Sequence, residues 1–168
     1  MTKAAAQVLA SALEPTSPFH VHVKPGLQAL GKHSNCVRES ERKVTDSIDF
    51  DDATRAAHGH AHRWDYFLGV SGSPAPKGGR NKGGTAAPPS GDSIVAVEVH
   101  SASEGEVKVV IAKKEKSGPL LRAQLRAGRS VARWVWVASG KTAISPNSKY
   151  TRLLATARIE LVGAVLHL

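Results

Sequence analysis

The segment SIVAVEVHSA (residues 93–102) combines a run of small and β-branched residues with one glutamate and one histidine. Such a run predicts a buried β-strand, whose side chains point alternately to the two faces of a sheet. Glu98 and His100 therefore share a face and lie about 6 to 7 Å apart along the strand. A charge among apolar neighbours costs several kcal/mol of folding free energy unless it has a partner. The segment thus predicts a strand that carries an ion or a hydrogen-bond network on one face.

The segments around this strand predict the other elements of an α/β domain. From Gly26 to Ile48, apolar or small residues recur at the spacing of one helix face, and Glu41 falls on that face. Helices are also predicted at residues 2–13, at GPLLRAQLRAG (118–128) from Pro119, and at SPNSKYTRLLATAR (145–158) with a Ser145 cap. Further strands are predicted at RWDYFLGV (63–70), GEVKVVIAKKE (105–115), RWVWVAS (133–139) and IELVGAVLHL (159–168). This order predicts a mixed central sheet flanked by helices.

The length of 168 residues suits one domain with its own core, and we predict a single domain over residues 1–168. Residues 1–25 are predicted to form an N-terminal helix and arm, in which FHVHV (19–23) is a short strand or an extended segment. Residues 71–92 are rich in Gly, Pro and Ser and carry three basic residues, so they predict a long flexible loop between two strands.

The composition also bears on compartment and partners. The single cysteine, Cys36, excludes an internal disulfide and a thiolate metal cluster, which predicts a cytoplasmic protein. No segment approaches the roughly 20 apolar residues that span a bilayer, so no membrane insertion is expected. The formal net charge of +9 comes from 23 Lys and Arg against 14 Asp and Glu, and it favours a polyanionic partner such as nucleic acid.

The order of elements, with Asp65 in RWDYFLG and Glu98 and His100 in AVEVHSA, resembles the PD-(D/E)XK nuclease superfamily, which has the restriction-endonuclease-like fold. The resemblance covers residues 26–168. It implies metal-dependent hydrolysis of phosphodiester bonds in nucleic acid, with DNA as the expected substrate. One departure is that His100 stands where the family usually has lysine.

The resemblance implies a metal site at Asp65 and Glu98, whose carboxylates would bind Mg²⁺ or Mn²⁺ from adjacent strands. It also implies Glu41 as a further acidic residue of the site, in preference to Glu39, which lies further around the predicted helix. His100 is then a candidate general base, water-positioning residue or additional metal ligand, because imidazole titrates near neutral pH. Lys108, on the predicted next strand, is the alternative source of the missing ammonium group.

Basic and amide side chains near the predicted site are candidates for contacts with a nucleic-acid backbone. They are Lys77, Arg80 and Lys82 in the loop, and Arg122, Gln124 and Arg126 on the helix at 118–128. Arg129 and Arg133 extend this basic series. The alternative is that these charges only solubilise the surface.

Other interpretations stay open from the sequence alone. The absence of the usual lysine favours one alternative, a catalytically degenerate nuclease fold that binds nucleic acid or helps an assembly. A third alternative is an interaction domain whose basic surface binds an acidic protein partner, and a homodimer is compatible with each of these functions. The histidines of HGHAH (58–62) are predicted to lie in a solvated loop, because no Cys or acidic residue lies at zinc spacing around them.

Overall fold

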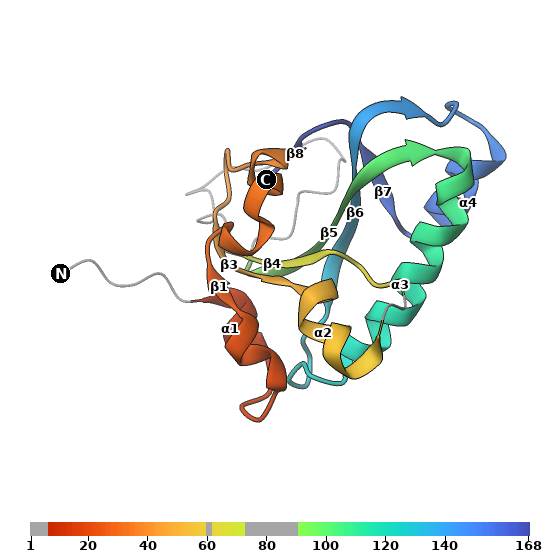
Figure 1. Cartoon of the computed structure of the whole chain (residues 1–168). Helices are drawn as coiled ribbons and strands as arrows, with labels where there is room; N and C mark the ends of the chain where they lie inside the picture. The colour runs from red at the N-terminus through yellow and green to blue at the C-terminus, as the bar shows by residue number, and fades with distance from the viewer. Residues whose placement is uncertain (1–6, 60–61, 73–90) are drawn as a thin grey trace.

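A six-stranded sheet forms the centre of the protein (Figure 1), in a computed structural model that describes residues 7–59, 62–72 and 91–168. The strands lie in the order β1 (Lys24–Pro25), β3 (Val44–Asp49), β4 (Tyr66–Val70), β5 (Ser93–Ser103), β6 (Val131–Ala143) and β7 (Glu160–Val162). Neighbouring strands are antiparallel from β1 to β5, whereas β5 and β6 are parallel, as are β6 and β7. The predicted α/β class with a mixed central sheet flanked by helices is therefore confirmed.

Helices provide the connections that the parallel strands require, because such strands cannot be joined by a tight hairpin. The α-helices are α1 (Val8–Ala12), α2 (Phe50–His58), α3 (Val107–Arg122) and α4 (Lys149–Thr156). The 3₁₀ segments are η1 (Pro18–His22), η2 (Gln28–Cys36) and η3 (Glu104–Glu106). The helix α3 joins β5 to β6, and α4 joins β6 to β7. A separate parallel pair consists of β2 (Val37–Arg38) and β8 (Leu166–His167).

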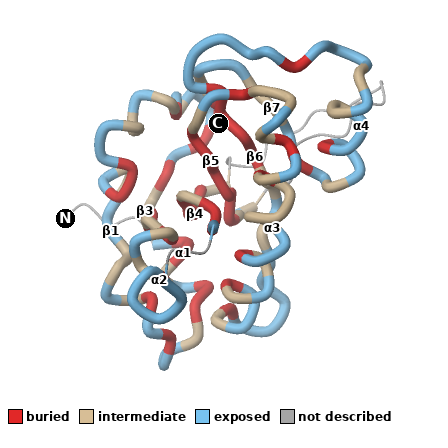
Figure 2. Tube along the Cα trace, turned by 45° about the vertical axis from the view of Figure 1, so that its right-hand side comes forward, coloured by how far each residue is buried: buried red, intermediate tan, exposed pale blue. Residues whose placement is uncertain are grey.

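The core has two layers, one on each face of the sheet. Residues of all four α-helices contribute to the first layer, among them Leu9, Phe50, Val110 and Leu154, together with the indole of Trp136. On the other face, residues of η2, β2 and β8 pack against the valines of β5 and β6. Figure 2 shows the resulting buried stretch along β4, β5 and β6, with exposed residues on the outer sides of the helices.

The strand β5 has the alternation that its sequence predicts. Val95, Val97 and Val99 lie in one core layer, whereas Ile94 and Ala96 lie in the other. Because β5 is paired on both edges and covered on both faces, nearly continuous apolar sequence is what its position requires.

The predicted helix at residues 26–48 is wrong. The structure has the 3₁₀ segment η2 over Gln28–Cys36 and the strand β3 over Val44–Asp49. The strand β3 was missed because it contains buried polar residues, which a sequence pattern does not assign to a core strand. One of them is Asp46, whose carboxylate accepts the Leu9 and Ala10 amides at the start of α1 at 3.0 and 2.7 Å. Both amides are more than 30 residues away in sequence, so a local pattern could not reveal why an aspartate is buried there.

The predicted strand at residues 105–115 is also wrong, because these residues begin α3. Val107, Val110 and Leu121 are buried at helical spacing, which anchors α3 on the sheet despite the β-branched residues. Pro119 lies inside this helix and does not begin it.

Several other boundaries differ from the prediction. Residues 18–22 form a 3₁₀ turn in place of the expected strand or extended segment at 19–23. The last helix is capped by Ser148, whose hydroxyl accepts the Thr151 amide at 3.3 Å. The closing strand is divided into β7 and β8. The loop predicted at 71–92 does join two strands, β4 and β5, although most of it lies outside the described residues. Among the described helices, none is long and apolar enough to cross a membrane.

Candidate active site

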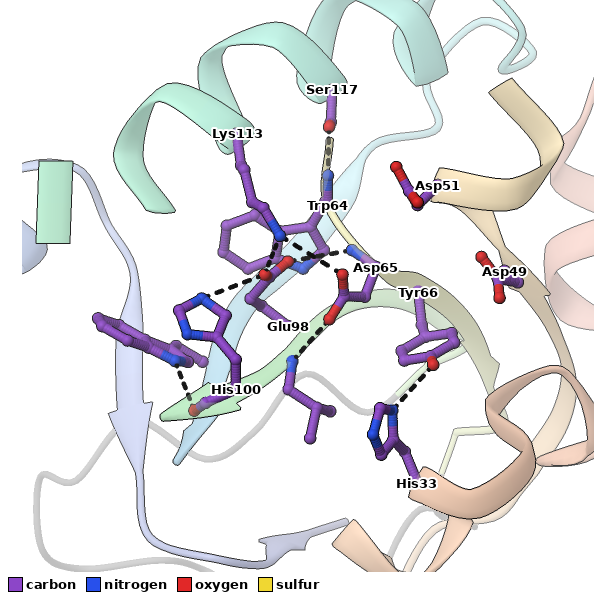
Figure 3. Close-up of polar contacts among 12 residues, drawn as sticks. His33, Asp49, Asp51, Trp64, Asp65, Tyr66, Glu98, His100, Lys113 and Ser117 are labelled. Carbon is purple, nitrogen blue, oxygen red and sulfur yellow. Dashed lines mark hydrogen bonds and ion pairs between the residues drawn. The ribbon is translucent and has the colours of Figure 1, made fainter. Parts of the chain in front are cut away.

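The carboxylates of Asp65 and Glu98 meet where the neighbouring strands β4 and β5 leave their ladder (Figure 3). The pairing of Tyr66 with Val97 places Asp65, the residue before β4, opposite Glu98. The Asp65 amide donates to Glu98 Oε2 at 3.1 Å, and the Val99 amide donates to Asp65 Oδ2 at 3.0 Å. Each carboxylate is thus held by a backbone amide of the other strand, which fixes their separation and orientation.

Lys113 of α3 inserts its ammonium group between the two carboxylates. The Lys113 Nζ atom lies 3.5 Å from Asp65 Oδ1 and forms an ion pair with Glu98 Oε1. The helix directs this side chain at the sheet because Lys113 lies one turn from Val110 and one turn from Ser117, both of which are buried. The Ser117 hydroxyl accepts the Trp64 amide at 2.8 Å, so it ties the same helix face to the residue next to Asp65.

His100 completes the cluster from the same strand as Glu98. Its Nε2 atom lies 3.2 Å from Glu98 Oε1, and its Nδ1 atom lies 2.8 Å from the Ser101 carbonyl oxygen. The Glu98 side chain is fully buried, whereas the side chains of Asp65 and His100 retain 23% and 25% of their exposure. The open side of the cluster is therefore formed by Asp65 and His100, above a buried glutamate.

Burial and mutual charge shift the titration of these groups. Desolvation, reinforced by the negative charge of Glu98, raises the pKa of Asp65 to about 6, although Lys113 acts in the opposite direction. Burial by itself lowers the pKa of His100 and of Lys113, but hydrogen bonding and attraction to Glu98 outweigh it, so both pKa values are raised. The site therefore favours positive charge around Glu98.

The donor chemistry of this cluster fits a hard divalent cation. Asp65 Oδ1 and Glu98 Oε1 face a common point, and that point is taken by the Lys113 ammonium, a cation shared by both carboxylates. Carboxylate oxygens are the ligands that Mg²⁺ and Mn²⁺ prefer. Within the described residues, no group of three or more His, Cys, Asp or Glu side chains is arranged to hold a metal ion.

The structure separates Glu41 and Lys108 from this cluster. Glu41 is exposed in the loop between β2 and β3, because the helix that was expected to carry it does not exist. Lys108 is exposed on α3, so it is not the alternative ammonium group that was predicted. Glu39, the other acidic residue considered, accepts the Val44 amide at 2.6 Å.

The predicted nucleic-acid contacts are dispersed. Lys77, Arg80 and Lys82 lie outside the described residues. Arg122 lines a cavity beside α3, Gln124 lines a different cavity, and Arg126 donates to the Leu13 carbonyl oxygen at 2.9 Å. Arg129 is exposed, and Arg133 forms two hydrogen bonds with Glu160 at 3.0 and 2.6 Å. Of the HGHAH histidines, His58 and His62 are exposed, and His60 lies outside the described residues.

Lys113 is the residue of the cluster that sequence reasoning missed. Because residues 105–115 were predicted to form a strand, Lys113 was not expected to point toward Glu98. The burial of Val107, Val110, Ser117 and Leu121 shows the signal that a helical interpretation would have used, since Lys113 falls within that stripe. No protein family, curated protein sequence or solved structure was found to match the chain.

Proposed function

We propose that the protein is a metal-dependent nuclease and that Asp65, Glu98, His100 and Lys113 form its active site. The observation that carries the proposal is the convergence of two carboxylates from adjacent strands on one lysine ammonium. The surrounding topology supports it: an antiparallel meander of β3, β4 and β5, followed by α3 and the parallel strand β6, has the order expected for a restriction-endonuclease-like core.

In this proposal Asp65 and Glu98 hold Mg²⁺ or Mn²⁺ at the oxygens that now face Lys113. The bound metal supplies charge neutralisation at the scissile phosphate and lowers the pKa of the attacking water. Lys113, released from between the carboxylates, keeps its ammonium close by, where it can bind a phosphate oxygen and offset charge that develops there. Its raised pKa keeps it protonated at neutral pH.

His100 is placed to handle a proton at the exposed side of the site. With Nδ1 beside the Ser101 carbonyl oxygen and Nε2 beside Glu98 Oε1, both ring nitrogens face hydrogen-bond acceptors, which fits the raised pKa of His100 and a protonated ring that donates to both. In this proposal Nε2 can take up a proton from water, or orient the water, once the ring has lost its own proton and turned from Glu98. Asp65 has to be ionised to bind a metal ion, and its pKa is raised to about 6 in the metal-free site, so metal binding should weaken as pH falls below about 6.

Nucleic acid is the proposed substrate, with DNA expected ahead of RNA from the family resemblance alone. The net charge of +9 supports a polyanion as substrate. Binding should accordingly weaken as salt concentration rises.

A second candidate function is a nucleic-acid-binding protein with a degenerate site. The observation that favours it is that Lys113 already neutralises the buried Glu98, so the cluster is internally paired without a metal ion. An acidic protein partner is a third proposal, which rests only on the basic surface.

A cleavage assay separates these functions. Wild-type protein is incubated with supercoiled plasmid, linear duplex, single-stranded DNA and RNA in Mg²⁺, in Mn²⁺ and in EDTA. The proposal expects cleavage that needs the metal and is lost in Asp65→Asn and Glu98→Gln, with Glu41→Gln as the charge-matched control that stays active. Salt-sensitive binding without cleavage of any substrate would favour the degenerate site, and neither binding nor cleavage would favour a protein partner.

A further inference from the structure

A second cluster of basic side chains lies on the other side of α3 from Lys113. It lines a cavity of about 630 Å³ between α3, the first residues of β6 and the end of α4. The cavity exists because β7 pairs only with Val135–Val137, which leaves residues 131–134 of β6 uncovered on that side. Figure 1 shows α4 and α3 beside β7, the strand at this edge of the sheet. Consecutive residues of one helix thus face different sites, Lys113 the carboxylates and Lys114 the cavity.

The charge of this cavity is unbalanced. Four cationic side chains line it, Lys114, Arg122, Arg133 and Arg158, against one carboxylate, Glu160. Glu160 is engaged by Arg133 in two hydrogen bonds. Arg122 and Arg158 form no side-chain hydrogen bond or ion pair with any described residue. Both arginines line the cavity from exposed positions, and no described protein group occupies their hydrogen-bond donors.

Lys114 adds a cation whose position is fixed by the protein. Its ammonium donates to the carbonyl oxygens of Ala157 and Arg158 at the end of α4, and it lies 5.3 Å from the centre of the Trp134 ring. Burial, and then the charge of Arg158, lower the pKa of Lys114. An anion in the cavity would relieve this repulsion between cations.

Trp134 lines both this cavity and a smaller one of about 70 Å³, which Gly118 also lines. Lys114, Gly118 and Arg122 form one stripe along α3, with a cation at each end and no side chain in the middle. A Cβ atom on Gly118 would lie 3.8 Å from the Trp134 ring, which is an ordinary contact. The absence of a larger side chain thus leaves open the smaller cavity, which shares Arg122, Val131 and Trp134 with the larger one.

The geometry points to a binding site for a nucleotide phosphate in this cavity, recognised by Arg122 and Arg158, with the sugar or base against Trp134 and Val131. Guanidinium groups suit phosphate oxygens because they donate paired hydrogen bonds. A volume of about 630 Å³ exceeds a single phosphate and lies in the range of small-molecule sites. This site is separate from the proposed metal site, and its binding does not depend on cleavage.

The test measures binding in EDTA at low salt, by anisotropy of a labelled single-stranded oligonucleotide and by calorimetry with a 5′-mononucleotide and its unphosphorylated nucleoside. Arg122→Gln/Arg158→Gln should weaken phosphate-dependent binding roughly tenfold or more. Gly118→Leu should do the same without changing any charge, because it fills the space above Trp134. The control Arg38→Gln/Arg152→Gln removes the same charge from two arginines that are equally exposed but do not line the cavity, and it should have a much smaller effect.

Binding of the mononucleotide but not the nucleoside, lost in the cavity variants, supports a free nucleotide as ligand. Binding of the oligonucleotide alone, lost in the same variants, supports a nucleic-acid strand as the source of the phosphate. Equal losses in the cavity and control variants, or no binding of either probe by wild-type protein, would overturn the inference. Because metal is absent throughout, failure of the nuclease proposal leaves this result unaffected.

Discussion

Replacing Asp65 by asparagine should stabilise the folded protein at neutral pH while it removes a proposed metal ligand. Desolvation and the charge of Glu98 raise the pKa of Asp65 from 3.8 to about 6. Each pKa unit corresponds to about 1.4 kcal/mol, so the ionised carboxylate costs about 3 kcal/mol relative to the protonated group. Asparagine carries no charge and still offers an oxygen to the Val99 amide, which now donates to Asp65 Oδ2 at 3.0 Å.

The stabilisation should depend on pH in a defined direction. The folded protein binds the Asp65 proton more tightly than the unfolded chain, so the contribution of Asp65 to wild-type stability falls as pH rises from about 4 to about 6 and is level above that range. Asparagine does not titrate. The variant should therefore gain almost nothing near pH 3, about half of the full gain at pH 5 and the full gain of about 3 kcal/mol at pH 7.5.

Urea unfolding at pH 5 and pH 7.5, followed by tryptophan fluorescence, measures this difference. Glu41→Gln is the matched control, because Glu41 is exposed and the substitution removes the same charge. The control should change the free energy of unfolding by less than about 0.5 kcal/mol. An Asp65→Asn variant that is less stable than wild type at pH 7.5, or whose gain is the same at both pH values, would refute the reasoning.

Three further substitutions test the site and its support. Lys113→Met should lower the free energy of unfolding at pH 7.5 by about 3 kcal/mol, because the buried Glu98 loses its cation. The exposed Lys108 provides the control Lys108→Met. Similar losses of stability in both variants would contradict this role of Lys113. In the cleavage assay His100→Ala should reduce turnover roughly a hundredfold and leave nucleic-acid binding intact, whereas His100→Lys should stay active. An unaffected His100→Ala would transfer its role to Lys113. Gly69→Ala should destabilise by about 3 kcal/mol in urea unfolding, since a Cβ would overlap the Asp46 carboxylate and the Leu9 amide; a loss below about 1 kcal/mol would count against this packing.

The part of the site on β4 and β5 was predictable because its signal is local. The alternation in β5 fixes the face of Glu98 and His100. The aromatic-rich segment that forms β4 is predicted as the neighbouring strand, and it carries Asp65 at its start. Pairing of the two strands as an antiparallel hairpin then brings the carboxylates together.

The contribution of α3 was not predictable from local preference. The sequence VKVVIAK (107–113) is rich in β-branched residues, which favour strands. Its helical state follows from topology, since β5 and β6 are parallel and need a crossover. Local preference is a weak guide when such a tertiary requirement acts on the same residues.

The prediction for Glu41 was wrong because a local apolar pattern at residues 26–48 indicated a helix where the structure has η2 and β3. The polar residues Asp46 and Ser47 resemble the polar side of a helix in sequence, but both are buried in β3. Ser47 accepts the Ala29 amide at 3.2 Å and donates to the Gly26 carbonyl oxygen at 2.6 Å. Partners at such sequence distances, like those of Asp46 on α1, become visible only in the folded chain.

A crystal structure with Mn²⁺, measured near the manganese absorption edge, tests the proposed metal site most directly. The account predicts an anomalous peak about 2 Å from Asp65 Oδ1 and Glu98 Oε1, with the Lys113 ammonium moved from between them. A crystal of Asp65→Asn in the same solution should show no peak there. Wild-type crystals in which Lys113 stays between the carboxylates and no manganese binds to either of them would contradict the account.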